Sequence, residues 1–147
     1  MTTTPTPQML VPRLVVPDAA AALDWYARAL GASERERHTA PSGLVVEALI
    51  SVRGAAVSVV DEKPEWGNVA PSSLGGSAVL LRLHVDDADA AGAQMVENGA
   101  TIVVPIADRF YGFREGRLQD PFGHLWILSQ HLEDVSAEEI QRGLEGM

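Results

Sequence analysis

The sequence contains no cysteine and only one lysine, Lys63, and these shortages exclude several classes of protein. Without cysteine there is no disulfide framework and no thiolate chemistry. The 147 residues carry 11 Lys and Arg against 20 Asp and Glu, a formal net charge of −9, and no basic run interrupts this acidic balance. Because neutralisation of phosphates dominates nucleic-acid affinity, we expect no binding to DNA or RNA. Binding to an acidic membrane surface is disfavoured for the same reason.

Long apolar runs are also missing, since none approaches the ~20 residues that a membrane-spanning helix needs. Residues 1–8, MTTTPTPQ, have neither the basic start nor the apolar stretch of a signal peptide. We therefore expect a flexible polar N-terminal tail and a cytoplasmic protein. What the chain does have is 46% hydrophobic and 21% charged residues, in a length typical of one globular domain.

A weak internal repeat organises the chain, because residues 11–32 align with residues 80–100 at an offset of 69, falling to 68 after the helix. The aligned pairs are Arg13 with Arg82, Val16 with Val85, Asp18 with Asp87 and Gly31 with Gly99. Each copy reads as an apolar strand, an Asp able to N-cap a helix, and a helix that stops at glycine. Three further strands are expected after each helix, at about 34–39, 44–52 and 55–61, and at about 101–107, 112–119 and 124–130.

The pattern is βαβββ written twice. It predicts one domain over residues 9–132, with module 1 at 9–61, a Pro/Gly/Ser-rich linker at 61–77 and module 2 at 78–132. A capping box from Ser136 to Glu139 opens a C-terminal helix within residues 133–147. By the layer rules this is an α+β fold, a concave mixed sheet with outer helices, in which both halves line a cavity.

Five segments carry a resemblance to a known family: LVVPDAAAALDWYARALGA, SVVDEKPEWG, VDDADAAGAQMVENGATIVVP, FYGFREGRLQDPFGHLWIL and EDVSAEE. From about residue 9 to 142 they resemble the vicinal oxygen chelate (VOC) superfamily, and within it the PhnB-like glyoxalase/bleomycin resistance protein branch. The resemblance implies the glyoxalase/bleomycin resistance/dihydroxybiphenyl dioxygenase fold, a homodimer and a ligand cavity in the concave sheet. In the superfamily's enzymes it implies a divalent metal held by four side chains, whereas its non-enzymatic members lack that site and sequester antibiotics.

Carried over by register, the four metal positions fall on Val11, Ser58, Leu80 and Ile127. None is a usual metal ligand, because such cations need imidazole or carboxylate donors. We therefore expect no metal and no other cofactor. The histidines, at 38, 84, 124 and 131, form no HxH or HExxH pair and are expected to be solvated or to stabilise turns.

Strand alternation predicts which side chains face the cavity. The opening strands offer Val11, Arg13 and Val15, and then Leu80, Arg82 and His84; the closing strands offer Ala56, Ser58, Val60, Leu125, Ile127 and Ser129. Their alternates should pack beneath the helices: Leu14, Val16, Leu81, Leu83, Val85, Val57, Val59, Trp126 and Leu128. A surface of this kind suits an aromatic or planar ligand with an acceptor or anionic group. Alternatively, Arg13 and Arg82 lie near the rim and pair with carboxylates.

The aromatic residues outside these strands divide into core and candidate site. Trp25 and Tyr26 are expected in the core, and Trp66 in the linker either stacks on a ligand or closes the sheet edge. Tyr111 and Phe113 are expected to form a lip of the cavity, while Arg114 and Asp120 are expected to bridge and hold the hairpin.

Two functions follow. The first is metal-independent binding or sequestration of an aromatic or antibiotic-like metabolite, with candidate contacts Val11, Arg13, Ser58, Trp66, Leu80, Arg82, His84, Tyr111, Phe113 and Ile127. The second is a glyoxalase-like lyase or isomerase, or another VOC enzyme, using His84 as general base, Arg82 or Arg13 to stabilise an oxyanion and Glu47 for proton transfer, or an atypically placed metal. A structural or regulatory dimer also stays open, as does pairing of the modules within one chain or across a dimer.

Overall fold

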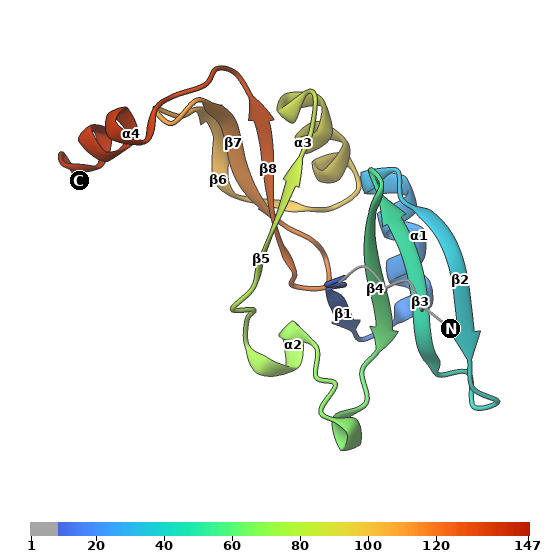
Figure 1. Cartoon of the computed structure of the whole chain (residues 1–147). Helices are drawn as coiled ribbons and strands as arrows, with labels where there is room; N and C mark the ends of the chain where they lie inside the picture. The colour runs from blue at the N-terminus through green and yellow to red at the C-terminus, as the bar shows by residue number, and fades with distance from the viewer. Residues whose placement is uncertain (1–8) are drawn as a thin grey trace, which may run out of the picture.

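The computed structural model describes residues 9–147, so the tail expected at residues 1–8 lies outside the described residues. Each half of the chain forms one four-stranded mixed sheet, and Figure 1 shows the two sheets side by side. The first contains, in spatial order, β1 (Arg13–Val16), β4 (Ala55–Asp61), β3 (Val45–Val52) and β2 (Ser33–Thr39). The second contains β5 (Leu80–His84), β8 (Leu125–His131), β7 (Phe113–Gln119) and β6 (Thr101–Asp108). The predicted α+β architecture of two βαβββ modules is confirmed.

The strand pairing is the same in both modules. In each sheet the first strand runs parallel to the last, and the other neighbours are antiparallel. Arg13 pairs with Ser58 in the first sheet and Arg82 with Ile127 in the second, which keeps the offset of the sequence repeat. Positions equivalent in the sequence are therefore equivalent in space.

The helices begin and end where the caps predict. In α1 (Ala19–Leu30) the Asp18 carboxylate accepts from the Ala21 N–H at 3.2 Å, and the helix ends at Gly31 with φ +67°. In α3 (Ala88–Glu97) the Asp87 carboxylate accepts from the Ala90 N–H at 3.0 Å. A left-handed residue ends a helix cleanly because it turns the chain away while satisfying the last carbonyls, and only glycine adopts that φ at little cost.

The core lies between the sheets and these two helices. The residues predicted to pack there are buried or packed against it, among them Leu14, Val16, Leu83 and Val85. Trp25 and Tyr26 are also buried, as predicted. The buried residues of both modules form one continuous hydrophobic cluster, which holds the two halves together.

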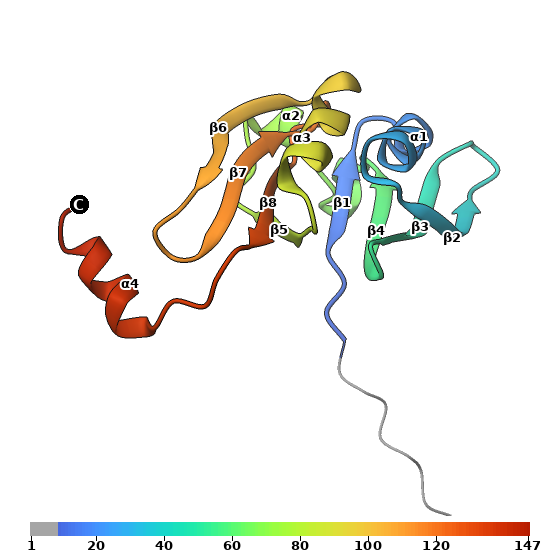
Figure 2. The same ribbon diagram turned by 90° about the horizontal axis from the view of Figure 1, so that it is seen from above.

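The modules join on the helix side, where Figure 2 shows α1 and α3 next to each other. The Trp25 indole of α1 donates to the Asn98 carbonyl at 2.6 Å, and the Gln94 amide donates to the Arg28 carbonyl at 2.6 Å. Tyr26 donates its hydroxyl to Asp120, in the turn before β8, at 2.6 Å. The faces of the sheets opposite the helices stay free of these contacts, and they provide the surfaces where a ligand can bind.

Two segments depart from or extend the core architecture. The linker holds two short elements that its composition did not predict, η1 (Pro64–Trp66) and α2 (Pro71–Leu74), each started by proline and ended by glycine. At the other end, α4 (Ala137–Leu144) starts after Ser136 as predicted and projects away from the second sheet in Figures 1 and 2. No helix within residues 9–147 is long and apolar enough to cross a membrane.

Candidate functional site

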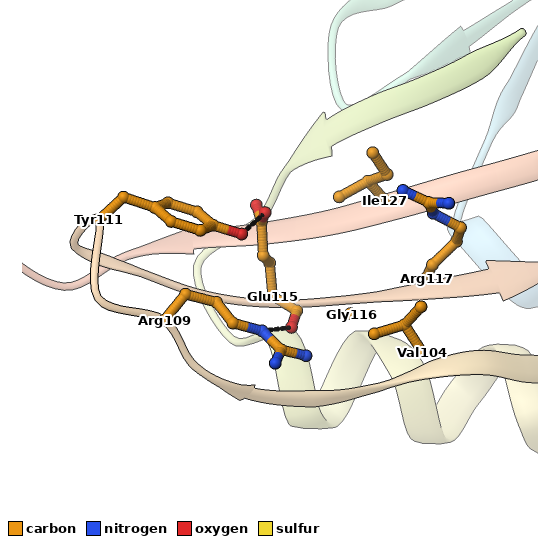
Figure 3. A pocket seen from close by; sticks show the side chains of 7 residues that line it. All are labelled: Val104, Arg109, Tyr111, Glu115, Gly116, Arg117 and Ile127. Atoms are coloured by element: carbon orange, nitrogen blue, oxygen red, sulfur yellow. Dashed lines mark hydrogen bonds between the residues drawn. The ribbon is translucent and has the colours of Figure 1, made fainter. Parts of the chain in front are cut away.

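A pocket of about 190 Å³ lies on the open face of the second sheet, at β6, β7, β8 and the loop that joins β6 to β7. Figure 3 shows the side chains that line it: Val104, Arg109, Tyr111, Glu115, Gly116, Arg117 and Ile127. Gly116 also lines the pocket, and β7 lies close to β6 there, because a Cβ on Gly116 would be 2.7 Å from the Val104 carbonyl oxygen. The pocket therefore combines aliphatic walls with two guanidinium groups, one carboxylate and one phenol.

Glu115 is the centre of a hydrogen-bond network at one end of this pocket. Its carboxylate accepts from the hydroxyls of Ser129 and Tyr111, and the Arg82 guanidinium lies 3.4 Å away. Burial alone would raise the pKa of Glu115, but these hydrogen bonds and the charges of Arg82 and Arg109 outweigh it and lower the pKa. Glu115 is thus an ionised anchor whose acceptor sites are engaged by neighbouring donors.

Tyr111 is held as a neutral donor by the same contact. Burial, followed by the hydrogen bond to Glu115 and the charge of that carboxylate, raises the pKa of Tyr111 to about 12. A phenol with this pKa stays protonated across the physiological range, so it can donate or accept a hydrogen bond but does not serve as a phenolate base. Figure 3 shows its ring at the loop end of the pocket, close to the position predicted for a lip.

Arg117 lies between two aliphatic neighbours. In the strand register it pairs with Val104 of β6 on one side and with Ile127 of β8 on the other. Its Nε is the one side-chain nitrogen or oxygen in residues 9–147 that is buried without a hydrogen-bond partner. Arg109 differs, since its guanidinium donates to the backbone carbonyls of Glu115 and Pro105.

The first sheet carries a pocket at the equivalent place, of about 320 Å³ and with different side chains around it. It is lined by Val11, Arg13, Glu36, Glu47, Leu49 and Ser58. Here Glu47 accepts from Arg13 and from the Ser58 hydroxyl. Arg13 and Arg82 therefore each pair with a carboxylate of their own module, and contact of either arginine with a ligand stays a prediction. The repeat recurs in the side chains as well as in the backbone.

A third pocket, of about 470 Å³, lies where the two modules meet, between the start of β1 and strands β5 and β8. It is lined mostly by apolar residues, among them Val11, Val57, Leu81 and Trp126, and Arg82 reaches it. Its apolar lining and position between modules make it a further surface where a small molecule can contact the protein.

The residues at the four family metal positions do not fit a divalent cation. Val11, Leu80 and Ile127 offer no donor atom, and Ser58 donates its hydroxyl to Glu47. Within residues 9–147, no group of three or more His, Asp or Glu side chains is placed to hold a metal ion. The side chains at the family positions therefore lack the donor set that a divalent metal requires.

Of the three proposed catalytic groups, Arg82 and His84 lie beside the same phenyl ring and Glu47 lies apart from them. Glu47 lies in the pocket of the first sheet, whereas Arg82 contacts Glu115 and Ser129 in the second. His84 is exposed, with its ring centroid 6.0 Å from that of Phe113, and the Arg82 guanidinium carbon lies 4.7 Å from the same phenyl centroid.

Other predicted contacts lie outside the pocket of the second sheet. Phe113 packs between Arg82 and His131, and Leu80 is 41% exposed at the start of β5. Trp66 is 61% exposed, with the Lys63 ammonium 4.8 Å from its ring centroid. Of the predicted ligand contacts, only Tyr111 and Ile127 line the pocket drawn in Figure 3.

The predicted bridge from Arg114 to Asp120 is wrong. Arg114 pairs instead with Asp89, at 3.0 Å, and with Asp108, at 2.9 Å. Asp120 is 3% exposed and accepts from Tyr26, Trp126 and two backbone N–H groups of its own turn. Arg114 does not reach Asp120, and both oxygens of this buried carboxylate already accept hydrogen bonds from other donors.

Three residues predicted to face the cavity are buried, and one of them is Ser58, 4% exposed with its hydroxyl bonded to Glu47. Ser129 is fully buried because Arg82 and Glu115 lie over its hydroxyl, and Val60 is 1% exposed. Sequence reasoning in turn missed Arg109, Glu115 and Arg117. For two of these a signal was present, because alternation in FREGRLQ puts Glu115 and Arg117 on the face opposite the buried Leu118.

Comparison with known proteins places this geometry in a family. The sequence model of the Glyoxalase/Bleomycin resistance protein/Dioxygenase superfamily matches residues 8–128. An uncharacterized protein of Mycobacterium bovis is 38% identical over 138 residues, covering 92% of this chain and 91% of that protein. An uncharacterized protein of Mycobacterium tuberculosis H37Rv is also 38% identical over 138 residues, covering 92% of this chain and 81% of that protein.

Solved structures agree. TioX from Micromonospora sp. ML1 is 27% identical with a TM-score of 0.68, covering 86% of this chain and 100% of that one. The fosfomycin resistance protein FosX from Listeria monocytogenes, in complex with Mn(II) and sulfate, is 14% identical with a TM-score of 0.65, covering 92% of this chain and 97% of that one. At 14% identity, the likeness to FosX shows the fold alone. Because the family model spans most of the residues, the chain belongs to the Glyoxalase/Bleomycin resistance protein/Dioxygenase superfamily.

Proposed function

We propose that this protein binds a small organic molecule on the open face of the second sheet, without a divalent metal, and so acts by binding or sequestering an aromatic or antibiotic-like metabolite. The observation that carries the proposal is the pocket at β6–β8, in which Ile127 occupies a family metal position and forms an apolar wall. An aliphatic wall beside an aromatic ring and a few polar groups is the usual composition of a small-molecule site. The PhnB-like branch suggested by the sequence agrees with this function.

Binding is favoured over catalysis by the state of the candidate catalytic groups. Glu47 is engaged by Arg13 and Ser58, and Arg82 is engaged by Glu115 and Ser129. A general base must accept a proton from the substrate, and both oxygens of the Glu47 carboxylate already accept hydrogen bonds from the protein. The arrangement therefore supports recognition of a ligand rather than proton transfer to or from it.

We also propose that the protein works as a homodimer, as the resemblance implies. Apolar side chains are exposed along β6, where Ile102 is 51% and Val103 48% exposed, and on α4, where Leu144 is 43% exposed. The projecting α4 has no buried residue although its sequence is amphipathic. A second copy that covers these residues would remove their apolar surface from water, which favours association. A cytoplasmic location stays a prediction of the sequence.

Native mass spectrometry of protein purified gently from cells, without added metal or chelator, tests the proposed function. We expect a mass of twice the chain with a carried organic adduct, retained after treatment with a chelator. In Ile127→Trp the larger side chain fills the pocket, so the adduct should be lost. In Leu74→Trp, at an exposed position of α2, the adduct should be retained.

Protein that carries no adduct can be screened against a collection of aromatic fragments by ligand-observed NMR, with the same two variants. Saturable binding that is lost only in Ile127→Trp supports the proposal. A stoichiometric divalent metal, or fragment binding indifferent to Ile127→Trp, would show that the function or its place in the fold is wrong.

A further inference from the structure

The pocket on the second sheet contains a positive charge with no partner in the described chain. Arg117 takes part in none of the ion pairs among residues 9–147, and its Nε is buried without an acceptor. Burying a donor without an acceptor costs free energy, so such groups in folded proteins call for an explanation. One explanation is that the acceptor comes from a molecule outside the chain.

The nearest carboxylate of the pocket is not free to serve. Glu115 lies two residues before Arg117 on the same face of β7, but its oxygens are engaged by Ser129, Tyr111 and Arg82. The positions paired with Arg117 across the sheet, Val104 and Ile127, have no polar side-chain atom. These aliphatic side chains offer the guanidinium no acceptor, and Figure 3 shows it beside Ile127, at the pocket that all three side chains line.

A second guanidinium reinforces the charge. Arg109 lines the same pocket, and its hydrogen bonds go to backbone carbonyls, which leave its positive charge unneutralised. Since Arg82 offsets Glu115, the pocket keeps the charges of Arg109 and Arg117, in a chain whose net charge is −9. The positive charge of this pocket therefore contrasts with the negative net charge of the chain. An anion would be attracted to the pocket and repelled by the protein as a whole.

We propose that the pocket binds the oxyanion of its ligand, a carboxylate, phosphonate or phosphate attached to an apolar or aromatic body, and that Arg117 donates to it with the support of Arg109. This inference rests on the proposed function and adds the charge class of the ligand. The planar guanidinium of arginine matches two oxygens of such a group, and hydrogen bonds between charged partners are the strong ones. Val104, Ile127 and Tyr111 then contact the body of the ligand.

Phenylphosphonate is a suitable probe, with benzyl alcohol as its uncharged counterpart, because the two share the phenyl ring and differ in the oxyanion. Binding to the intact protein is measured by NMR at low ionic strength, following the arginine Nε–Hε resonances. We expect phenylphosphonate to shift the Arg117 resonance and to bind at least about tenfold more tightly than benzyl alcohol, as a charged hydrogen-bonded pair requires.

Two variants localise the effect. Arg117→Met keeps an unbranched stem between Val104 and Ile127 but removes the charge, so the preference for phenylphosphonate should disappear. Arg35→Met removes a charge from exposed β2 of the first sheet and should leave the preference unchanged. If Arg117→Met does not fold, the shift of the Arg117 resonance in the unaltered protein decides the question.

Four results would overturn the inference. Equal binding of the two probes, or a preference that survives Arg117→Met, would refute the oxyanion subsite and leave the proposed binding function standing. No saturable binding of phenylphosphonate up to about 10 mM would do the same, because the carried adduct tests the function separately. Loss of the dimer in Arg117→Met would show that a carboxylate of a second copy, rather than a ligand, partners this guanidinium.

Discussion

Asp120 offers the sharpest test of how the two modules are held together. This carboxylate is 3% exposed and lies in the turn between β7 and β8. One oxygen accepts from the Tyr26 hydroxyl at 2.6 Å and the Trp126 indole at 3.0 Å, and the other accepts from the N–H groups of Phe122, at 2.9 Å, and His124, at 3.0 Å. Tyr26 belongs to module 1 and the other donors to module 2, so the carboxylate joins the modules as well as closing its turn.

The magnitude follows from the donors left behind. Asp120→Ala strands the Tyr26 and Trp126 donors in the core, and each unsatisfied buried group costs about 1–3 kcal/mol, so we expect a loss of roughly 4 kcal/mol in the free energy of unfolding. Asp120→Asn keeps an acceptor for the two backbone N–H groups but places an NH₂ toward two donors. The Tyr26 hydroxyl can rotate to accept from it and the indole cannot, so about half of that loss is expected.

Urea denaturation, followed by fluorescence and circular dichroism, measures the free energy of unfolding of both variants. Glu97→Ala, on the exposed side of α3, is the control and should change this free energy by less than about 0.5 kcal/mol. In a double-mutant cycle, Tyr26→Phe and Asp120→Ala should be strongly non-additive, because each removes the same hydrogen bond. A loss below about 1 kcal/mol for Asp120→Ala, or additivity in the cycle, would refute the assignment of this carboxylate as the link between modules.

Three further predictions concern the two tyrosines, Glu115 and the turn before β7. Burial and Glu115 raise the pKa of Tyr111 to about 12, and burial and Asp120 raise that of Tyr26 well above its usual value, so a spectrophotometric titration at about pH 11 should find little phenolate. A phenolate signal of two residues at that pH in folded protein would contradict both environments. The lowered pKa of Glu115 gives stability that is present above its unfolded pKa and lost as the pH falls through the folded value, so Glu115→Gln should flatten the loss of stability between about pH 6 and about pH 3. An equally steep loss in the variant would contradict this contribution. Gly112→Ala should destabilise more than Gly43→Ala in urea denaturation, because both have φ near +90° but only at Gly112 would a Cβ collide with a backbone oxygen, that of Glu133. Equal losses would mean that φ strain alone acts.

The fold was predictable from sequence because its signals are local. The aspartates before each helix and the glycines after it mark boundaries through hydrogen bonds that span three or four residues, and the structure places α1 and α3 between them. Alternation fixes the faces of β1 and β5 in the same way, since Leu14 and Leu83 are buried and their neighbours Arg13 and Arg82 are exposed. The two short helices of the linker were not predicted, because proline and glycine are common both in non-helical turns and at the ends of a single helical turn.

The site was only partly predictable because its contacts are not local. Alternation puts Arg82 on the open face, but its partner Glu115 lies 33 residues away on a strand that is not adjacent to β5 in the sheet. Asp120 was misassigned for the same reason, since Tyr26 is separated from it by 94 residues. Pairing across such distances depends on how helices and sheets pack, and periodicity within one element carries no information about it.

The repeat distinguishes the side chains that both modules share from the one that we propose binds a ligand. Glu47 and Glu115 occupy equivalent places, each paired with the arginine of its module's first strand, so this charge pair belongs to the fold of the module. Leu49 and Arg117 are equivalent too, since Leu49 pairs with Ser58 and Arg117 with Ile127. In the first sheet an apolar residue occupies this position, and the strands pair in the same register. The guanidinium in the second module therefore adds nothing that the fold requires, and its buried Nε without an acceptor adds a cost that a ligand oxyanion would offset.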